Sequence, residues 1–305
     1  MNERPKLTIL CLHKITDESF PSWPGMPFKT FEKLLKYISK NYEVCLPHQV
    51  KENSKKKQLI LTFDDGFEDF YLNAFPLLKK YKIPSVLNVV VECVTTNYQI
   101  WTQRLNDVLD AYAFKNKSFG VLIEEEYFRY DISIDKAEVI ALDIFKKLLP
   151  IPKIERELVI SQLEEKVSNE INKTKMMNLS QLKEVSAAGI VIGSHSLSHP
   201  NLKIEDTSLD LLEKEFSESK IQLESLLNKP VDVFAFPNGM YSEKSIEIAK
   251  EAGYKYLLLV DNDLAKFSFK DEVKVLDRIL IYSNNHYKNI FRINNFHNRI
   301  RKWLK

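Results

Sequence analysis

Short apolar runs rich in β-branched and aromatic residues recur along the chain and alternate with segments of helical periodicity. Strands are predicted at Leu7–Leu12, Leu59–Phe63, Val86–Val91, Ile190–Ile192, Val231–Phe236, Tyr256–Val260 and Val275–Ile281. Between most of these runs, apolar residues spaced i, i+3 and i+4 predict amphipathic helices, as in Thr30–Ile38 and Ser208–Leu227. This alternation of strand and helix predicts an α/β fold with a parallel sheet or barrel.

Polar residues cluster directly after several of the predicted strands. They are His13, Asp64, Asp65, His195 and the turn Pro237–Gly239. In a parallel βα barrel, the residues that follow the strands share the C-terminal face, where such enzymes build their sites. The pattern therefore predicts one site at that face.

The region from Asn97 to Asn178 interrupts the alternation, because it is charged, helix-prone and nearly free of strands. One short strand is expected near Tyr127–Ile134, and amphipathic helices are expected at Lys136–Leu149 and Ile154–Val167. We expect a mostly helical insertion, residues 97–178, within a single domain of residues 1–305. It is either a cap packed on the barrel rim or a lid that helps to select the substrate.

Composition narrows the classes of partner. At 305 residues the chain can bury one large core, and 44 Lys and Arg against 42 Asp and Glu leave a formal charge of +2. That balance gives no electrostatic footprint for nucleic acid. Cys11, Cys45 and Cys93 are widely spaced, which excludes a disulfide framework and a thiolate zinc site and predicts buried, reduced thiols.

We predict the compartment from the N-terminal segment, the lengths of the apolar runs and the charge of the C-terminal tail. We see no signal peptide and no apolar run near the ~18 residues of a membrane span, so a complete chain would be cytoplasmic. The basic tail His297–Lys305 permits peripheral contact with an anionic membrane surface; a solvated helix end is the alternative. The oligomeric state stays open.

Two motifs carry the chemistry. In Thr62–Gly66, two adjacent carboxylates follow an apolar run, where they need a cation or a proton. In His195–His199, two imidazoles have a spacing that one metal ion can accept. Each motif alone also fits a solvated loop or a satisfied histidine. Their joint appearance after separate strands favours a metallohydrolase site.

These motifs, with Phe234–Gly239, resemble the polysaccharide deacetylase family, also called the NodB-homology or carbohydrate esterase family 4 deacetylases. Leu10–Ile15 is similar to the N-terminal Tyr-His motif of the branch that deacetylates poly-N-acetylglucosamine. The resemblance covers roughly residues 7–95 and 178–282. It implies an irregular (β/α)7-type barrel and the metal-dependent removal of N-acetyl groups from a glycan or sugar conjugate that contains N-acetyl-hexosamine.

The resemblance also implies roles for single residues. Asp65, His195 and His199 would hold one divalent metal, and Asp64 would be the general base that takes a proton from the attacking water. A backbone N–H near Asn238 would help to stabilise the oxyanion. Zn²⁺ is favoured by its borderline softness, and Co²⁺, Ni²⁺ or Fe²⁺ would also accept two His and one Asp.

The chain departs from the family pattern at three places. It lacks the C-terminal Leu-x-His motif that supplies a general acid, which nominates His13; a merely structural histidine is the alternative. Ala235 replaces an Arg that orients the catalytic Asp, so Arg278 is expected to supply the positive charge beside Asp64, unless it forms a surface salt bridge. Asn238 replaces a Tyr and changes the pocket wall.

Four residues are expected to contact the sugar. They are Pro237 and Asn238 in the turn, and Trp23 and Trp101 as stacking platforms. For both tryptophans a packed hydrophobic anchor is the alternative. Three rival functions remain: a catalytically silent carbohydrate-binding protein, a deacylase or deformylase acting on a non-polymeric amide, and another metallohydrolase such as a peptidase or phosphoesterase.

Overall fold

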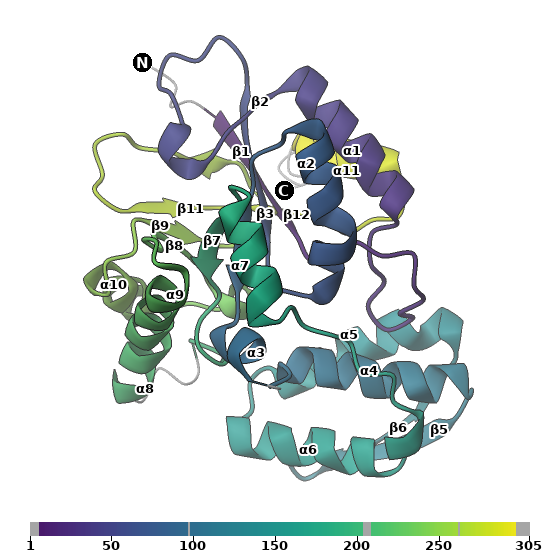
Figure 1. The fold of residues 1–305 in the computed structure, drawn as a ribbon. Coiled ribbons are helices and arrows are strands. Elements are labelled where there is room, and N and C mark those ends of the chain that lie inside the picture. Colours follow the sequence, from purple (N-terminus) through teal and green to yellow (C-terminus); the bar gives the residue numbers. More distant parts are fainter. Residues whose placement is uncertain (1–5, 97, 204–208, 262, 297–305) are drawn as a thin grey trace.

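The centre of the molecule is a ten-stranded sheet with the path β10-β1-β3-β4-β7-β8-β9-β11 (Figure 1). The computed structural model describes residues 6–96, 98–203, 209–261 and 263–296. The strands of this sheet are β1 (Lys6–Leu12), β2 (Glu43–Val44), β3 (Gln58–Phe63), β4 (Val86–Val89), β7 (Val191–Ser194), β8 (Val233–Ala235), β9 (Tyr256–Leu258), β10 (Ala265–Lys266), β11 (Lys274–Leu276) and β12 (Ile279–Leu280).

The sheet nearly closes into a barrel, because β11 pairs with β9 while β12 pairs with β1, both in parallel. Only β10 runs antiparallel to its neighbour β1 among the pairings of this sheet in the described ranges. The single strand predicted over Val275–Ile281 is interrupted at Asp277 and Arg278. The interruption lets Arg278 turn inward, where its Nε donates to the carbonyl of Leu259 at 3.0 Å. The predicted α/β barrel is thereby confirmed.

Helices cover the outside of the sheet. They are α1 (Phe28–Asn41), α2 (Phe75–Tyr81), α3 (Val91–Thr95), α7 (Leu179–Ala187), α8 (Leu209–Glu213), α9 (Ser219–Leu227), α10 (Glu243–Glu251) and α11 (His286–Ile293). Two wide, π-helical turns join them: η2 (Phe70–Ala74) precedes α2, and η6 (Lys214–Glu218) links α8 to α9. The helix predicted to begin at Ser208 is therefore helical from residue 209, and Ser208 itself lies outside the described residues.

The main core fills the space between the sheet and these helices. Every residue of β3 is buried, as expected for a strand covered on both faces. On α1, the buried residues Phe31, Leu34, Leu35 and Ile38 follow the helical spacing that the sequence predicts. This core fixes the strands whose C-terminal ends carry the polar residues.

The insertion packs at one end of the barrel and has a hydrophobic core of its own (Figure 1). Its elements are α4 (Trp101–Phe114), β5 (Ser118–Ile123), β6 (Glu126–Asp131), α5 (Ala137–Leu148) and α6 (Lys153–Glu165). Strands β5 and β6 form an antiparallel hairpin. The sequence predicted a strand only near the second of them.

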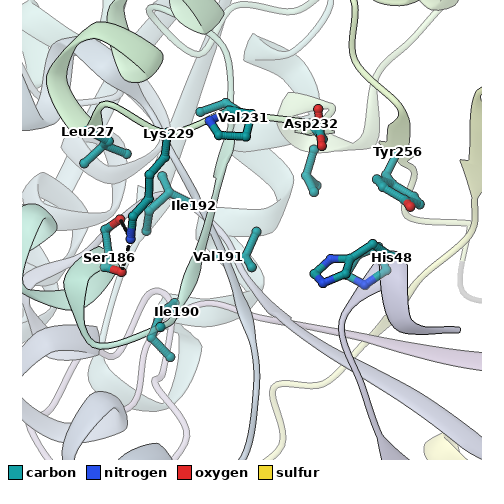
Figure 2. Close-up of a pocket in the computed structure, with 14 residues that line it drawn as sticks. His48, Ser186, Ile190, Val191, Ile192, Leu227, Lys229, Val231, Asp232 and Tyr256 are labelled. Carbon is teal, nitrogen blue, oxygen red and sulfur yellow. Dashed lines mark hydrogen bonds between the residues drawn. The ribbon is translucent and has the colours of Figure 1, made fainter.

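Figure 2 shows a cavity of about 250 Å³ at the opposite end of the barrel. Its lining includes Val191, Val233 and Tyr256, which begin or nearly begin β7, β8 and β9. The cavity therefore lies away from the strand ends that carry the two motifs.

None of the helices in the described ranges combines the length and hydrophobicity that a bilayer crossing requires. The basic tail His297–Lys305 lies outside the described residues, so its contact with a membrane surface stays a prediction.

Candidate metal centre

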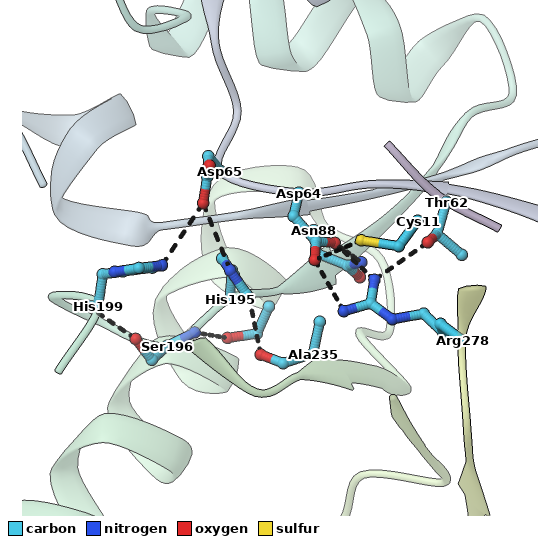
Figure 3. Close-up of polar contacts among 11 residues, drawn as sticks. Cys11, Thr62, Asp64, Asp65, Asn88, His195, Ser196, His199, Ala235 and Arg278 are labelled. Carbon is cyan, nitrogen blue, oxygen red and sulfur yellow. Dashed lines mark hydrogen bonds and ion pairs between the residues drawn. The ribbon is translucent and has the colours of Figure 1, made fainter. Parts of the chain in front are cut away.

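The polar residues predicted from the sequence meet at the C-terminal edge of the sheet (Figure 3). Asp64 and Asp65 follow β3, and His195 follows β7. His13 follows β1, and the turn Pro237–Gly239 follows β8 by one residue. Because all these strands are parallel, their carboxyl ends deliver the side chains to one place.

Three of these side chains form a cluster with the donor set of a metal site. The Oδ1 atom of Asp65 lies 3.4 Å from Nε2 of His195 and 3.5 Å from Nε2 of His199, and all three residues are buried. Both distances exceed the usual length of an N–H···O hydrogen bond. They match the separation of about 3.4 Å between tetrahedral ligands bonded to one ion at ~2.1 Å. The residues present therefore fit a divalent ion such as Zn²⁺.

The two imidazoles are oriented in different ways. Nδ1 of His195 lies 2.8 Å from the carbonyl oxygen of Ala235, which can only accept, so Nδ1 carries the proton and Nε2 keeps a free lone pair. Nδ1 of His199 is buried and finds no hydrogen-bond partner among the described residues. Burial, followed by the nearby His195, lowers the pKa of His199 to about 3, so the ring is neutral as a metal ligand must be.

The loops of this centre hold several residues in the left-handed backbone region. Asp65 has φ 73°, Ser196 φ 71°, His199 φ 61° and Asn238 φ 55°. Each such non-glycine conformation costs about 1–3 kcal/mol and persists only where the surroundings enforce it. Strain gathered at the candidate ligands and at the adjoining turn is typical of a functional site.

Asp64 accepts hydrogen bonds from four directions (Figure 3). Arg278 donates from Nη1 to Oδ1 at 2.8 Å and from Nη2 to Oδ2 at 2.7 Å. Asn88 donates from Nδ2 to Oδ1 at 2.7 Å, and the Cys11 thiol donates to Oδ2 at 3.3 Å. Burial alone would raise the pKa of Asp64, but the Arg278 guanidinium, together with His195 and His13, outweighs it and holds that pKa well below its usual range.

The buried position of Arg278 decides between its two interpretations from the sequence. Its side chain is fully buried, and both terminal nitrogens donate hydrogen bonds to Asp64. The ion pair between Arg278 and Asp64 is therefore not a surface salt bridge. The guanidinium reaches Asp64 from the interruption between β11 and β12, and not from the position of Ala235 on β8. Ala235 contributes its carbonyl to His195 instead.

Cys11, His13 and Asp64 form a second group of potential ligands, with donor atoms within 4.8 Å of one another. Two features argue against an ion there. The Arg278 guanidinium already neutralises Asp64, and burial raises the pKa of Cys11 well above its usual value, which keeps the thiol protonated. The centre built on Asp65 is therefore the metal candidate.

His13 and Trp23 form one wall beside this centre. Their rings meet edge to face with centroids 5.2 Å apart, and Trp23 also contacts Phe67 at 6.0 Å. The Lys14 ammonium lies 5.2 Å from the Trp23 ring and is itself buried. Burial lowers the pKa of His13, so the imidazole is neutral at neutral pH. Trp23 is partly exposed and remains available as a platform.

Trp101 does not share this location, which corrects the expectation of a second sugar platform. It is only 1% exposed and stacks on Phe145 with centroids 5.5 Å apart, inside the core of the insertion. Arg156 covers its ring at 4.5 Å. A face buried between two neighbours cannot receive a sugar ring, so Trp101 is the packed anchor that the sequence left as the alternative.

Pro237 and Asn238 lie in the turn after β8, as the motif predicts. Pro237 is buried, whereas Asn238 is partly exposed and its Nδ2 has no hydrogen-bond partner within the described part of the chain. The left-handed conformation of Asn238 and the following Gly239 turn the backbone sharply at this edge of the sheet.

Sequence reasoning missed three contributors to the centre. Asn88 and Cys11 bind Asp64, and Glu215 binds the His195–His199 loop through three hydrogen bonds. The sequence could have pointed to Asn88, because an amide inside an otherwise apolar run is costly to bury unless it forms hydrogen bonds. Nothing in the sequence singled out Glu215, because it lies in a helical segment with several other acidic residues.

Comparison with known proteins places the fold and the motifs in a family. Residues 51–107 and 160–257, which are half of the chain, match the family model for polysaccharide deacetylases. The chain belongs to the polysaccharide deacetylase family. This polysaccharide deacetylase homologue is 20% identical over 261 residues to the Bacillus subtilis protein YxkH, which carries the same family name. The match covers 83% of this chain and 64% of YxkH, so the chain spans less than two thirds of that relative's length.

Two solved structures share the barrel. The Streptococcus pyogenes deacetylase PplD, solved in complex with acetate, has a TM-score of 0.61 and 20% identity, covering 95% of this chain and 99% of PplD. IcaB from Ammonifex degensii has a TM-score of 0.60 and 16% identity, covering 95% of this chain and 97% of IcaB. At these identities the likeness establishes the fold that this family member adopts.

Proposed function

We propose that this chain is a metal-dependent hydrolase that removes N-acetyl groups from a glycan or glycan precursor containing N-acetyl-hexosamine. The observation that carries the proposal is the buried cluster of Asp65, His195 and His199 beside a second carboxylate, Asp64, held by Arg278. Family membership supports the same activity. A silent carbohydrate-binding protein would gain nothing from a charged carboxylate buried beside a metal cluster.

Asp65, His195 and His199 would hold the divalent ion, for which Zn²⁺ is favoured by the donor set. When bound, such an ion polarises the amide carbonyl and acidifies a water molecule. Asp64 accepts the proton of the attacking water at its carboxylate, which its low pKa keeps ionised. Arg278 and Asn88 fix the direction of that carboxylate.

The developing oxyanion needs a donor, and the leaving amine needs a proton. The backbone N–H of Asn238, in the strained turn after β8, supplies the donor in this proposal. His13 supplies the proton. Because burial keeps its imidazole neutral, His13 first takes up the proton collected by Asp64, whose carboxylate oxygen lies within 4.8 Å of it.

We further infer that the chain falls within the family branch that carries an N-terminal Tyr-His-like motif. Two features support this placement: His13 stands beside the centre at the end of β1, and Arg278 compensates for the small Ala235. The partly exposed Trp23 and Asn238, with Pro237 in the same turn as Asn238, would contact the sugar. The branch resemblance favours a polymer of N-acetylglucosamine or a precursor of it.

The test is acetate release from a panel of N-acetylated glycans and sugar conjugates by metal-reconstituted protein, run beside Asp64→Asn. Release by the wild type that is lost in the variant, with metal content unchanged, would support the deacetylase. Stoichiometric metal without acetate release from any substrate would contradict it and would favour a binding protein or another scissile bond.

A further inference from the structure

The His195–His199 loop must hold two ligands in place with a backbone that does not favour its own conformation. Ser196 and His199 both have left-handed φ angles. His195 is oriented by its hydrogen bond to the Ala235 carbonyl, but Nδ1 of His199 has no such partner among the described residues. The direction of the His199 ring therefore depends on the backbone that carries it.

Side-chain oxygens accept the hydrogen bonds of four consecutive backbone amides in this loop. The Ser196 amide donates to Oγ of Ser194 at 3.1 Å, and the His199 amide donates to Oγ of Ser196 at 2.9 Å. The two amides between them, of Leu197 and Ser198, both donate to Oε2 of Glu215, at 2.8 and 3.0 Å. Successive amides pointing to one side form a nest that binds an anion, and here the anion belongs to the chain itself.

Glu215 makes a third bond to the same loop, because the Ser198 hydroxyl donates to Oε1 at 2.6 Å. The carboxylate is 2% exposed, so these donors replace the water that an ionised group needs. It projects from η6, the π-helical turn between α8 and α9. The next helix, α9, contacts the end of β7 directly before the loop, through the hydrogen bond from Ser194 Oγ to Ser219 Oγ at 2.9 Å.

We propose that Glu215 is a positioning residue for the metal centre: its carboxylate fills the amide nest of the His195–His199 loop and fixes the left-handed backbone that aims His199. The inference rests on the proposed function, since it requires that His199 binds a metal ion. It adds a residue outside the three ligands and outside the contacts of Asp64.

The test measures metal binding by the full chain after removal of metal with a chelator. Zn²⁺ affinity is obtained by competition with a chromophoric chelator, and Co²⁺ binding is followed by its visible absorption, which reports coordination geometry. Glu215→Gln keeps the size of the side chain and one oxygen acceptor but removes the charge. Ser198→Ala removes only the third bond. The matched control is Glu224→Gln, because Glu224 on α9 also accepts a backbone amide, that of Val231 at 2.9 Å, at a loop away from the metal centre.

We expect Glu215→Gln to weaken Zn²⁺ binding by about 10- to 100-fold and to change the Co²⁺ absorption, as loss of an outer partner of a metal ligand does. Ser198→Ala should weaken it by roughly threefold, and Glu224→Gln should leave it unchanged. Circular dichroism of the metal-free variants shows whether the fold is kept.

Wild-type Zn²⁺ affinity and an unaltered Co²⁺ spectrum in folded Glu215→Gln would overturn the inference while leaving the proposed function intact. If Glu215→Gln fails to fold, the test rests on Ser198→Ala, and a wild-type Zn²⁺ affinity in that variant overturns the inference. A wild type that binds neither ion stoichiometrically would overturn the proposed function and this inference with it.

Discussion

At the scale of single residues, the centre depends on how one carboxylate is held. Asp64 accepts two hydrogen bonds from Arg278, one from Asn88 and one from Cys11. The sequence predicted the Arg278 contact, because the family pattern requires a positive charge there and Ala235 lacks one. It could not predict that Asn88 binds Asp64, because this contact depends on the register of β4 with its neighbours β3 and β7.

Asn88 is paired with Gly193 in that register, and a Cβ built at Gly193 would lie 2.2 Å from the Asn88 amide oxygen. We expect Asn88→Leu and Gly193→Ala each to lower the kcat of acetate release by about 10- to 100-fold, or about 1.4–2.7 kcal/mol. Either change takes the amide away from Asp64. Metal content should not change.

The double variant is the control for this prediction. If Gly193 acts only by giving Asn88 room, adding Gly193→Ala to Asn88→Leu should cost little more than Asn88→Leu alone. Independent, additive losses in a double-mutant cycle would show that Gly193 has a separate role.

A second residue-scale prediction concerns Asp69, a half-buried residue near Lys14 whose carboxylate atom Oδ1 is buried. Its Oδ2 accepts from the Ile15 amide at 3.1 Å, and burial raises its pKa to about 7 although Lys14 opposes the rise. Because the native pKa exceeds the unfolded value of about 4, the free energy of unfolding should fall as pH rises from about 4 to about 7.

Asp69→Asn keeps an acceptor for Ile15 and removes this titration. At pH 8 the variant should be more stable than the wild type by about 2–4 kcal/mol, since each pH unit is worth about 1.4 kcal/mol. At pH 4.5 the gain should be nearly absent. Urea unfolding of the metal-free proteins at both pH values measures it, and a gain of equal size at both would refute the assignment.

At the scale of elements, hydrophobic periodicity located the strands and most helices but not their interruptions. The break between β11 and β12 follows from Arg278 turning inward, which depends on the distant Asp64 and is invisible to local pattern. Periodicity also did not reveal the π-helical turn η6 within the segment that it predicted as one helix. Within the insertion, Trp101 was misplaced because periodicity cannot tell whether a tryptophan packs inside a segment or faces a cleft.

The insertion also holds a loop of the barrel. Asp110 on α4 accepts a hydrogen bond from the buried Ser22 amide at 2.7 Å, directly beside Trp23. Asp107 on the same helix accepts from the Thr174 amide at 2.9 Å. The bond from Ser22 to Asp110 favours the interpretation of the insertion as a fixed cap that supports the Trp23 loop, whereas the bond from Thr174 lies within the insertion.

Asp110→Ala should lower the free energy of unfolding by about 1–3 kcal/mol, because it leaves the Ser22 amide buried without an acceptor. Asp110→Asn is the matched variant, since its side-chain oxygen can still accept, and it should retain most of the stability. Chemical denaturation compares the three proteins. An equal loss in both variants would show that the charge, and not the hydrogen bond, is what matters.

At the scale of the whole molecule, the alternation of strands and helices was enough to predict a parallel barrel with its chemistry at one face. The sequence did not reveal how the barrel closes, because β12 is short and its pairing with β1 joins the two ends of the described chain. The three ligands come from segments after β3 and β7. Metal binding should therefore stabilise the barrel as a unit.

Zn²⁺ at about 100 times its dissociation constant should add about 2.7 kcal/mol to the free energy of unfolding. For a chain of this size that corresponds to a rise in melting temperature of about 4 °C. Calorimetry with and without Zn²⁺ measures the shift, and His199→Ala should largely abolish it. A shift of the same size in His199→Ala would place the ion elsewhere.

The packing of Asn88 against Gly193 also limits the order in which this sequence could have arisen. A Cβ at position 193 would lie 2.2 Å from the Asn88 amide oxygen, so a larger residue there and Asn88 in its present position exclude each other. If an ancestor carried a larger residue at position 193, that residue would have had to change to glycine before Asn88 could bind Asp64. Once Asn88 held the carboxylate, the glycine could no longer be exchanged alone. The two positions are therefore coupled, and reconstructed ancestors in which Asn88 binds Asp64 should carry Gly193.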